Sequence, residues 1–414
     1  MSLATAIARR LYGQSGSQHR VSRLPVSVAV WGIAVGLMVM VVSVCVMLGF
    51  KREIRLKVEG FAGDIELLNG ESVYAANASP IVVDSTVVQM LAAVPGVEHV
   101  QRFASIGGML KTDDAFQGIM LKGIAEDYDT AFLARHVVAG CLPRFSADSL
   151  SQQIVVSRLV ADALHLSVGD RVYAYFFAQA VRARRYTVAA VYETHLREFD
   201  SRVVYTDMPA VQQLAGWAPG QCAGAELRLT SFDDIGQVLA DVHALMHQSR
   251  DAYGAVYVPY SIVELYPGLF SWLDVLDTNV YVILVLMLLL SIFTMTAGLL
   301  IIILERTRFI AIMKSIGATN AQLRSIFLRL AAMLVGRGML WGNVLGIGLC
   351  LLQAHLHLVR LDAATYYLDS VPVALPWPVI ILINAATLLI TLMALIVPTH
   401  LVARVHPARV MRFE

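Results

Sequence analysis

Long runs of apolar residues divide this chain of 414 residues. A bilayer core about 30 Å thick is crossed by roughly 20 apolar residues in helical conformation. Four segments reach that length. They span residues 26–50, 279–304, 326–355 and 376–402. We therefore predict four transmembrane helices.

Between the first two spans the pattern changes to short alternating runs that are typical of β-strands. The predicted strands are residues 154–156, 171–175, 186–192 and 226–229, and the predicted helices are residues 85–94, 157–166, 209–215 and 231–247. Ser231 or Asp233 is the expected cap of the last helix. Residues 51–266 are long enough to form an α+β domain with its own core. The predicted fold is an α-helical polytopic membrane protein with this domain inserted between helices one and two.

The second predicted helix is longer than a bilayer requires. Pro267 suits a helix start, and a helix over residues 267–304 would be about 57 Å long. We expect roughly half of it to stand outside the lipid as a stalk, with residues 51–61 as its partner.

Basic residues in the short flanks predict the orientation. Segments 1–25, 305–325 and 403–414 carry an excess of Lys and Arg, whereas residues 356–375 contain Arg360 balanced by Asp362 and Asp369. Both termini are therefore expected in the cytoplasm, residues 51–266 in the periplasm, and 356–375 in a short periplasmic loop. Within the first segment, residues 4–11 predict an amphipathic helix on the inner face of the membrane.

Composition supports a membrane protein. Charged residues make up 15% of the chain and hydrophobic residues 57%, whereas a soluble domain of this size needs far more charge. The net charge of +1 gives no basic field for nucleic acid. Cys45 and Cys350 lie in apolar runs. Cys141 and Cys222 could form a disulfide if their region is exported, or remain two unpaired thiols.

Polar residues and glycines interrupt the apolar spans. Arg337 and Asn343 fall within the third span, where polar residues are functional candidates by default. We interpret them as snorkelling or interhelical contacts. Glycines four residues apart predict close helix packing, at Gly32, Gly36, Gly338, Gly342 and Gly346.

The loop between spans two and three predicts a short amphipathic helix. Phe309, Ile310 and Met313 would share one side and basic residues the other. Gly317 would end the helix, and Thr319 or Asn320 would cap the next. The loop is either an interfacial helix or a coupling helix that docks on a cytoplasmic ATPase.

This loop resembles the I-A-I-x-x-x-I-G-A signature of the FtsX-like permease domain in MacB-type (type VII) ABC transporter subunits. The match runs from Ile310 to Ala318, with Arg308 before it, and residues 406–414 are similar to the closing pattern of that family. Further blocks resemble the lipoprotein-releasing LolC/LolE permeases, at residues 7–11, 32–36, 57–65, 94–97, 121–124 and 168–170. Residues 176–184 lack the proline-rich hook that LolC-type chains carry there.

The resemblance implies a permease subunit of the bacterial inner membrane that extracts lipoproteins for delivery to the outer membrane. Its implied partners are a LolD-like ABC ATPase that binds ATP and Mg, a second permease (identical or paralogous), membrane lipid, the lipoprotein substrate and a LolA-like periplasmic carrier. The chain contains no G-x-x-x-x-G-K-[ST] loop, so no cofactor and no catalytic residue is expected on it. Alternatives are an FtsX-like mechanotransmitter that regulates a periplasmic hydrolase, and a MacB-like efflux or peptide-export permease.

Site residues follow from these expectations. The ATPase-coupling candidates are Arg308, Phe309, Ile310, Met313, Lys314 and Gly317. The candidates for an apolar substrate cavity are Val41, Val44, Leu48, Leu284 and Leu288. His243 and His247 share a helix face, but the metalloprotease glutamate is absent, so no metal site is expected.

Overall fold

The computed structural model describes residues 23–72, 78–146, 152–177, 181–218, 220–247 and 249–399. Its contacts divide the chain into two units. The helix unit contains Met1–Arg52, Trp272–Arg360 and Ser370–Glu414, and the strand unit contains Glu53–Ser271 and Leu361–Asp369. The amphipathic helix predicted at residues 4–11 and the tail at 403–414 lie outside the described residues.

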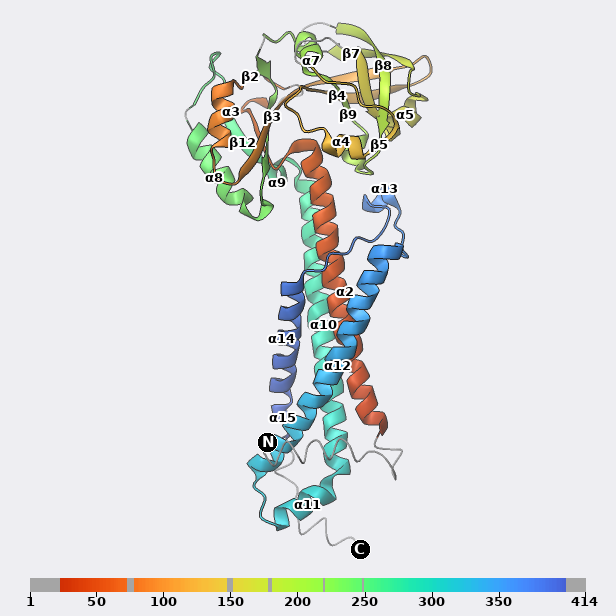
Figure 1. Cartoon of the computed structure of the whole chain (residues 1–414), viewed down its shortest axis with the longest axis vertical. Helices are drawn as coiled ribbons and strands as arrows, with labels where there is room; N and C mark the ends of the chain where they lie inside the picture. The colour runs from red at the N-terminus through yellow and green to blue at the C-terminus, as the bar shows by residue number, and fades with distance from the viewer. Residues whose placement is uncertain are drawn as a thin grey trace. The chain divides into compact units, whose positions relative to one another are not determined.

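Four long helices build the helix unit (Figure 1). They are α2 (Arg23–Ala62), α10 (Pro267–Glu305), α12 (Asn320–Leu356) and α14 (Trp377–Ala394), which continues into α15 (Ile396–Thr399). Within the described residues these are the helices long and apolar enough to cross a membrane, as the apolar runs predict. Shorter helices join them, α11 (Thr307–Ser315) between α10 and α12, and α13 (Ala363–Tyr366) between α12 and α14.

The helix boundaries follow local chemistry. The helix α10 starts at Pro267, as expected. Gly317 has a φ of +97°, which glycine adopts without strain and which ends the turn after α11. Thr319 caps α12 through a reciprocal capping box with Gln322. The predicted stop and the first of the two predicted caps are thus confirmed.

The helix unit has a continuous apolar core. Ile33, Leu37 and Val41 of α2 are fully buried, together with Phe327 and Leu334 of α12. The helices α2 and α10 are each unbroken from this unit into the strand unit.

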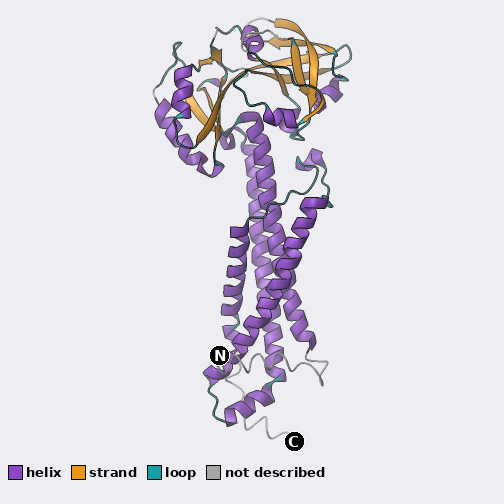
Figure 2. Ribbon diagram, in the orientation of Figure 1, coloured by secondary structure: helices purple, strands orange, loops and turns teal. Residues whose placement is uncertain are grey.

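The strand unit is a mixed sheet with short helices (Figure 2). Its strands are β1 (Ile65–Asn69), β3 (Val97–Lys111), β4 (Phe116–Ile124), β5 (Val137–Gly140), β6 (Gln153–Ser157), β7 (Arg171–Phe177), β8 (Val181–Tyr192), β9 (Val203–Asp207), β11 (Gly224–Leu229) and β12 (Tyr257–Ser261); β2 (Ile81–Val82) and β10 (Gln221–Cys222) pair separately. Its helices are α3 (Ser85–Ala92), α4 (Ala131–Arg135), α5 (Arg158–Leu164), α6 (Arg197–Asp200), α7 (Met208–Ala215), η3 (Phe232–Asp234), α8 (Ile235–Met246) and α9 (Ile262–Leu265).

Part of the sheet closes on itself. Pairings lead from β3 through β4, β9, β6, β8 and β7 back to β3. Alternate residues of these strands point into the core, where Phe176 and Tyr186 are among the largest fully buried side chains. From β3 the sheet continues outward through β11 and β1 to β12.

The predicted strands are confirmed as β6, β7, β8 and β11, but the long strands β3 and β4 were missed. Gly107, Gly108, Gly118 and Gly123 lie in them and weaken the β-pattern of the sequence. The prediction for the cap of the last helix was wrong. Asp234 precedes α8, Ser231 precedes η3, and neither makes a side-chain cap bond.

The structure distinguishes between the two alternatives for Cys141 and Cys222, a disulfide or two unpaired thiols. Cys141 is exposed and Cys222 is buried, both as free thiols. The Cys222 thiol donates to the carbonyl oxygen of Ile81, and burial raises its pKa to about 12. The structure therefore has two unpaired thiols rather than a disulfide.

Candidate functional site

The predicted coupling loop forms α11, and its two faces differ. Ile310 and Ala311 are buried in the core of the helix unit, and Met313 packs against that core. Phe309 and Lys314 are half-buried. Ile310 is therefore occupied within its own chain and presents no surface to a partner.

The exposed face of α11 carries two isoleucines that were not among the predicted coupling residues, together with Arg308, which was. Ile312 is 53% exposed and Ile316 is 76% exposed. Arg308, also exposed, lies four residues before Ile312, which places all three on one side of the helix. The spacing of four residues between them is visible in the sequence and could have predicted that they share one face. Two bare isoleucines beside an arginine form a surface that would gain from burial against a partner.

The glycine pairs lie at helix contacts. A Cβ on Gly36 would lie 2.5 Å from the Ser291 hydroxyl of α10, and a Cβ on Gly32 would lie 2.9 Å from the Thr294 hydroxyl. On α12, a Cβ on Gly342 would lie 2.8 Å from the carbonyl oxygen of Ala34. Gly338 and Gly346 face α2 in the same way, against Ile33 and Met38. Only the absence of side chains permits these close approaches.

An amide pair joins α12 to α14. Asn343 donates to the Oδ1 of Asn384 at 2.7 Å, and Asn384 donates back to the Oδ1 of Asn343 at 3.0 Å. Asn343 is thus an interhelical contact, one of the two interpretations of the sequence, and Asn384 is its unforeseen partner. Arg337 lies on the exposed face of α12.

The predicted cavity residues divide between the interior and the surface. Val41 and Val44 are buried within one chain, and Val41 lies against Gly346. Both side chains are therefore covered by neighbouring residues rather than exposed to a cargo, in contrast to the prediction. Leu48, Leu284 and Leu288 are half-buried. The exposed apolar residues of α10 lie beside them, at Tyr281, Val282, Val285, Leu286, Leu289, Leu290 and Phe293.

An apolar groove runs between α2 and α10. Its volume is about 370 Å³, and Ser27, Val28, Trp31, Gly32, Val35, Leu290 and Thr294 line it. Trp31 stacks on Trp341 of α12, with ring centroids 6.4 Å apart. Gly32 was predicted only as a glycine of close helix packing. In the structure it also lines this apolar groove.

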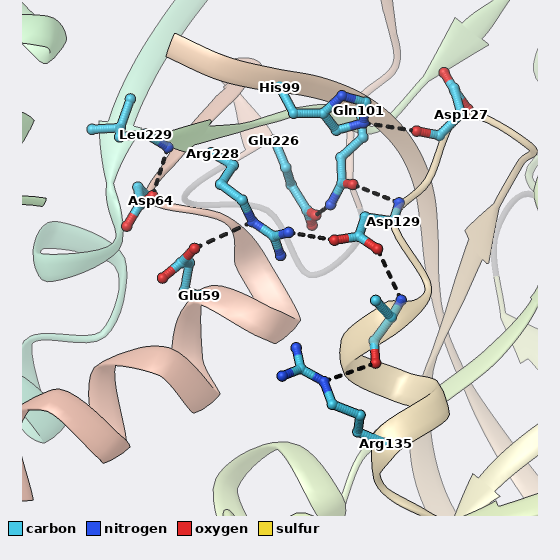
Figure 3. Close-up of polar contacts among 11 residues, drawn as sticks. Glu59, Asp64, His99, Gln101, Asp127, Asp129, Arg135, Glu226, Arg228 and Leu229 are labelled. Atoms are coloured by element: carbon cyan, nitrogen blue, oxygen red, sulfur yellow. Dashed lines mark hydrogen bonds and ion pairs between the residues drawn. The ribbon is translucent and has the colours of Figure 1, made fainter. Parts of the chain in front are cut away.

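In the strand unit, a network of charges binds the end of α2 to the sheet (Figure 3). Arg228 of β11 pairs with Glu59 of α2 at 3.2 Å and with Asp129. Asp64, just after α2, accepts the backbone N–H of Leu229 at 2.8 Å. This network, together with the Lys122 contacts described next, is called the polar joint. Its residues are Glu59, Asp64, Asp129, Arg228, Phe61, Gln101, Lys122 and Glu226.

A buried lysine completes the polar joint. The ammonium of Lys122 bonds the carbonyl oxygen of Phe61 in the last turn of α2 and the carboxylate of Glu226. Gln101 also donates to Glu226, at 2.8 Å. The side chains of Lys122 and Glu226 are only 5% and 1% exposed. A cation at a helix C-terminus is favourable, so this contact fixes the helix end. Glu66 lies beside Glu226, and burial, followed by the charge of Glu226, raises the pKa of Glu66 to about 8.

Among the described residues, no group of three His, Cys, Asp or Glu side chains could hold a metal ion. His243 and His247 stack with ring centroids 5.8 Å apart. The candidate functional features of the described residues are therefore the polar joint, the helix contacts at glycines, and the exposed apolar surfaces of α2, α10 and α11.

Comparison with known proteins agrees with this anatomy. Residues 27–245 match the MacB-like periplasmic core domain, and residues 281–407 match the FtsX-like permease C-terminal domain. Together the two matches cover residues 27–407 except for residues 246–280.

Relatives align over almost the whole chain. The lipoprotein-releasing system transmembrane protein LolC of Xylella fastidiosa is 21% identical over 93% of both chains, and LolE of Haemophilus influenzae is 23% identical over 92% of both. Among solved structures, the periplasmic region of MacB from Actinobacillus actinomycetemcomitans is 13% identical and covers 52% of this chain and 92% of its own, with a TM-score of 0.33. The chain belongs to the family of FtsX-like ABC transporter permeases that carry a MacB-like periplasmic core domain.

Proposed function

We propose that this permease extracts lipoproteins from the inner membrane for delivery to the outer membrane, driven by a separate ATPase subunit. The observation that carries the proposal is the alignment with LolC and LolE over more than nine-tenths of the chain. It extends through both units, so the proposal does not rest on the helices or on the sheet alone.

An ATP-driven permease of this family implies an ATPase and a second permease chain. The exposed face of α11, with Ile312 and Ile316, is our candidate for the ATPase contact, because the remaining apolar residues of that helix are buried or half-buried. Arg308 on the same face would add directional hydrogen bonds to acidic side chains. The ATPase would bind ATP and Mg, and this chain would perform no covalent chemistry.

The helices provide a route for force. The helix α10 is unbroken over 39 residues, about 58 Å at 1.5 Å per residue. Glycines allow α2 to pack closely against α10 and α12. We call these contacts the glycine seams; their residues are Gly32, Gly36, Gly338, Gly342 and Gly346. A push on α11 would therefore move packed helices together. The polar joint then ties the last turn of α2 to β4 and β11, and so transmits movement of the helix to the sheet.

The substrate surface follows from acyl-chain chemistry. Lipid chains need an apolar wall with few polar groups. The groove beside Trp31 and Val35 and the exposed stripe on α10 provide one. We propose these residues as the lipid-facing surface in place of Val41 and Val44, and Leu284 and Leu288 as its inner border.

Cell fractionation tests the proposal. The protein is depleted, inner and outer membranes are separated, and acylated outer-membrane lipoproteins are located. The proposal requires them to accumulate in the inner membrane. Normal sorting with a defect in cell separation would favour the FtsX-like mechanotransmitter instead, and normal sorting with lost drug or peptide export would favour the MacB-like permease.

A further inference from the structure

The middle of the loop between α12 and α14 belongs to the strand unit rather than to the helices that the loop connects. Residues Leu361–Asp369, which contain α13, group with Glu53–Ser271 by their contacts. Leu368 is buried. Part of the connection between two candidate membrane spans is thus packed as a segment of the folded domain.

Lys57 of α2 makes the central contact. Its ammonium donates to the carbonyl oxygen of Thr194 at 2.6 Å and to that of Tyr367 at 2.8 Å. Lys57 is half-buried. Burial lowers the pKa of its ammonium, and the charges of Asp369, Asp200 and Glu53 oppose that shift. One cation therefore binds three segments together, namely α2, the turn after β8, and the loop.

The carbonyl of Thr194 is itself held in place. The Thr194 hydroxyl and backbone N–H donate to Asp200 at 2.7 and 3.1 Å, and this carboxylate is buried. A fixed acceptor costs little further entropy when Lys57 binds it.

A contact between a histidine and two carboxylates reinforces the Lys57 bonds from the side. His195 Nε2 lies 3.2 Å from Asp369 Oδ2, and His195 Nδ1 lies 3.7 Å from Glu193 Oε1. Asp369 is 73% exposed, so this pair contributes little alone. Its role is to align the loop, whereas the bonds of Lys57 hold it.

One strained residue lies at the same place. His195 and Tyr367 have φ angles of +64° and +62°, in the left-handed region that non-glycine residues seldom adopt. Tyr367 directly follows α13, as His165 follows α5 and His357 follows α12, and after the last turn of a helix this conformation is ordinary. His195 follows no helix. Strain of this kind persists where surrounding contacts over-determine it, as at clamps and switches.

We propose that residues 361–369 form a latch that clamps the α12–α14 connection onto the strand unit through Lys57 and His195. Through the latch, movement of α12 and α14 reaches the domain by a path separate from the direct continuation of α2 and α10. This inference rests on the proposed function only in that the movement is driven by ATP, and not on the identity of the cargo.

Hydrogen exchange on the full-length protein tests the latch directly. Lys57→Met removes the ammonium and keeps the apolar stem, so amides of residues 361–369 are expected to exchange about tenfold faster. Lys57→Arg retains donors and should keep most of the protection. Lys111→Met, at an exposed lysine of the same unit, is the control and should change nothing in the loop. Equal exchange in Lys57→Met and wild type would overturn the latch.

A second arm tests coupling without reference to cargo. The complex is purified with its ATPase, and exchange in the strand unit is compared with and without a non-hydrolysable ATP analogue. The latch predicts that Lys57→Met loses at least half of the nucleotide-induced change, and that Asp369→His combined with His195→Asp restores more of it than either single substitution does. An undiminished change in Lys57→Met contradicts the coupling role.

The outcomes separate the two proposals. A nucleotide response that depends on Lys57, in a complex that releases no lipoprotein, refutes the proposed function and keeps the latch. Release that is unaffected by Lys57→Met keeps the function and refutes the latch.

Discussion

Glu66 is a carboxyl group buried in the strand unit next to a second one. Burial and the charge of Glu226 raise its pKa to about 8, and Lys122 opposes the shift. The folded-state pKa lies above the ordinary value of 4.5. At pH values between 4.5 and about 8 the folded protein therefore binds the Glu66 proton more tightly than the unfolded chain does. The associated stability is present below about pH 4.5 and is lost as the pH rises through 8.

We therefore predict that Glu66→Gln flattens the pH dependence of unfolding between pH 5 and 8. The slope removed is at most about 1.4 kcal/mol per pH unit. Thermal unfolding of the full-length protein in detergent, repeated across that range, measures it. A Glu66→Gln variant with the same pH profile as wild type would disprove the assignment.

The Lys122–Glu226 pair gives a second prediction at this scale. Glu226→Ala leaves the buried Lys122 ammonium with Phe61 and Tyr128 oxygens only. Removal of one partner from a buried pair typically costs about 3–5 kcal/mol. Chemical denaturation should show a loss of this size, whereas Glu98→Ala, at an exposed acid of β3, should be nearly neutral. A neutral Glu226→Ala would mean that the polar joint does not hold α2.

At the scale of elements, the glycine seam decides how α2 and α12 pack. A Cβ on Gly342 would meet Ala34 and Leu37 at 2.8 and 3.0 Å, whereas a Cβ on Gly348 would meet nothing within 4 Å. We predict that Gly342→Leu lowers stability by about 1–3 kcal/mol or more through overpacking, while Gly348→Leu on the same helix is tolerated. Thermal stability in detergent separates the two variants. Equal behaviour would place the helix contact elsewhere.

The helix α11 gives the other prediction for an element. Ile312→Asp or Ile316→Asp should prevent co-purification of the ATPase while the permease stays folded, since both side chains are exposed. Leu358→Asp, at an exposed leucine beyond α12, is the matched control. Undiminished co-purification in both isoleucine variants would remove α11 as the contact.

The elements also show what a sequence can and cannot predict. The spans are visible because apolar runs of that length have few other uses, and Thr319 is visible because a capping box is local in sequence. The amide pair of Asn343 and Asn384 is not visible, since its members lie 41 positions apart. Lys122 and Glu226 are separated by 104 positions, and glycines hide the strand that carries Lys122.

The burial of apolar residues was not visible in the sequence for a related reason. Val41 lies within a predicted span and Ile316 lies just beyond α11, both are apolar, yet Val41 is buried and Ile316 is exposed. Hydrophobicity alone does not distinguish a core position from a docking position. The distinction comes from the neighbouring helix, which only the fold provides.

At the scale of the whole molecule, we propose that the protein transmits force. Force would enter at α11, pass along the helices that pack at their glycines, and reach the sheet through the polar joint and the latch. The cargo would move because apolar surfaces change their exposure. The proposed assembly contains the chain, an ATPase and a second permease.

The most direct measurement is release from proteoliposomes. The permease, its second permease chain and its ATPase are reconstituted with an acylated lipoprotein, and ATP and a soluble carrier are added. We predict ATP-dependent transfer of the lipoprotein to the soluble fraction, abolished by Ile312→Asp and unchanged by Leu358→Asp. Vigorous ATP hydrolysis with the lipoprotein still in the membrane would contradict it.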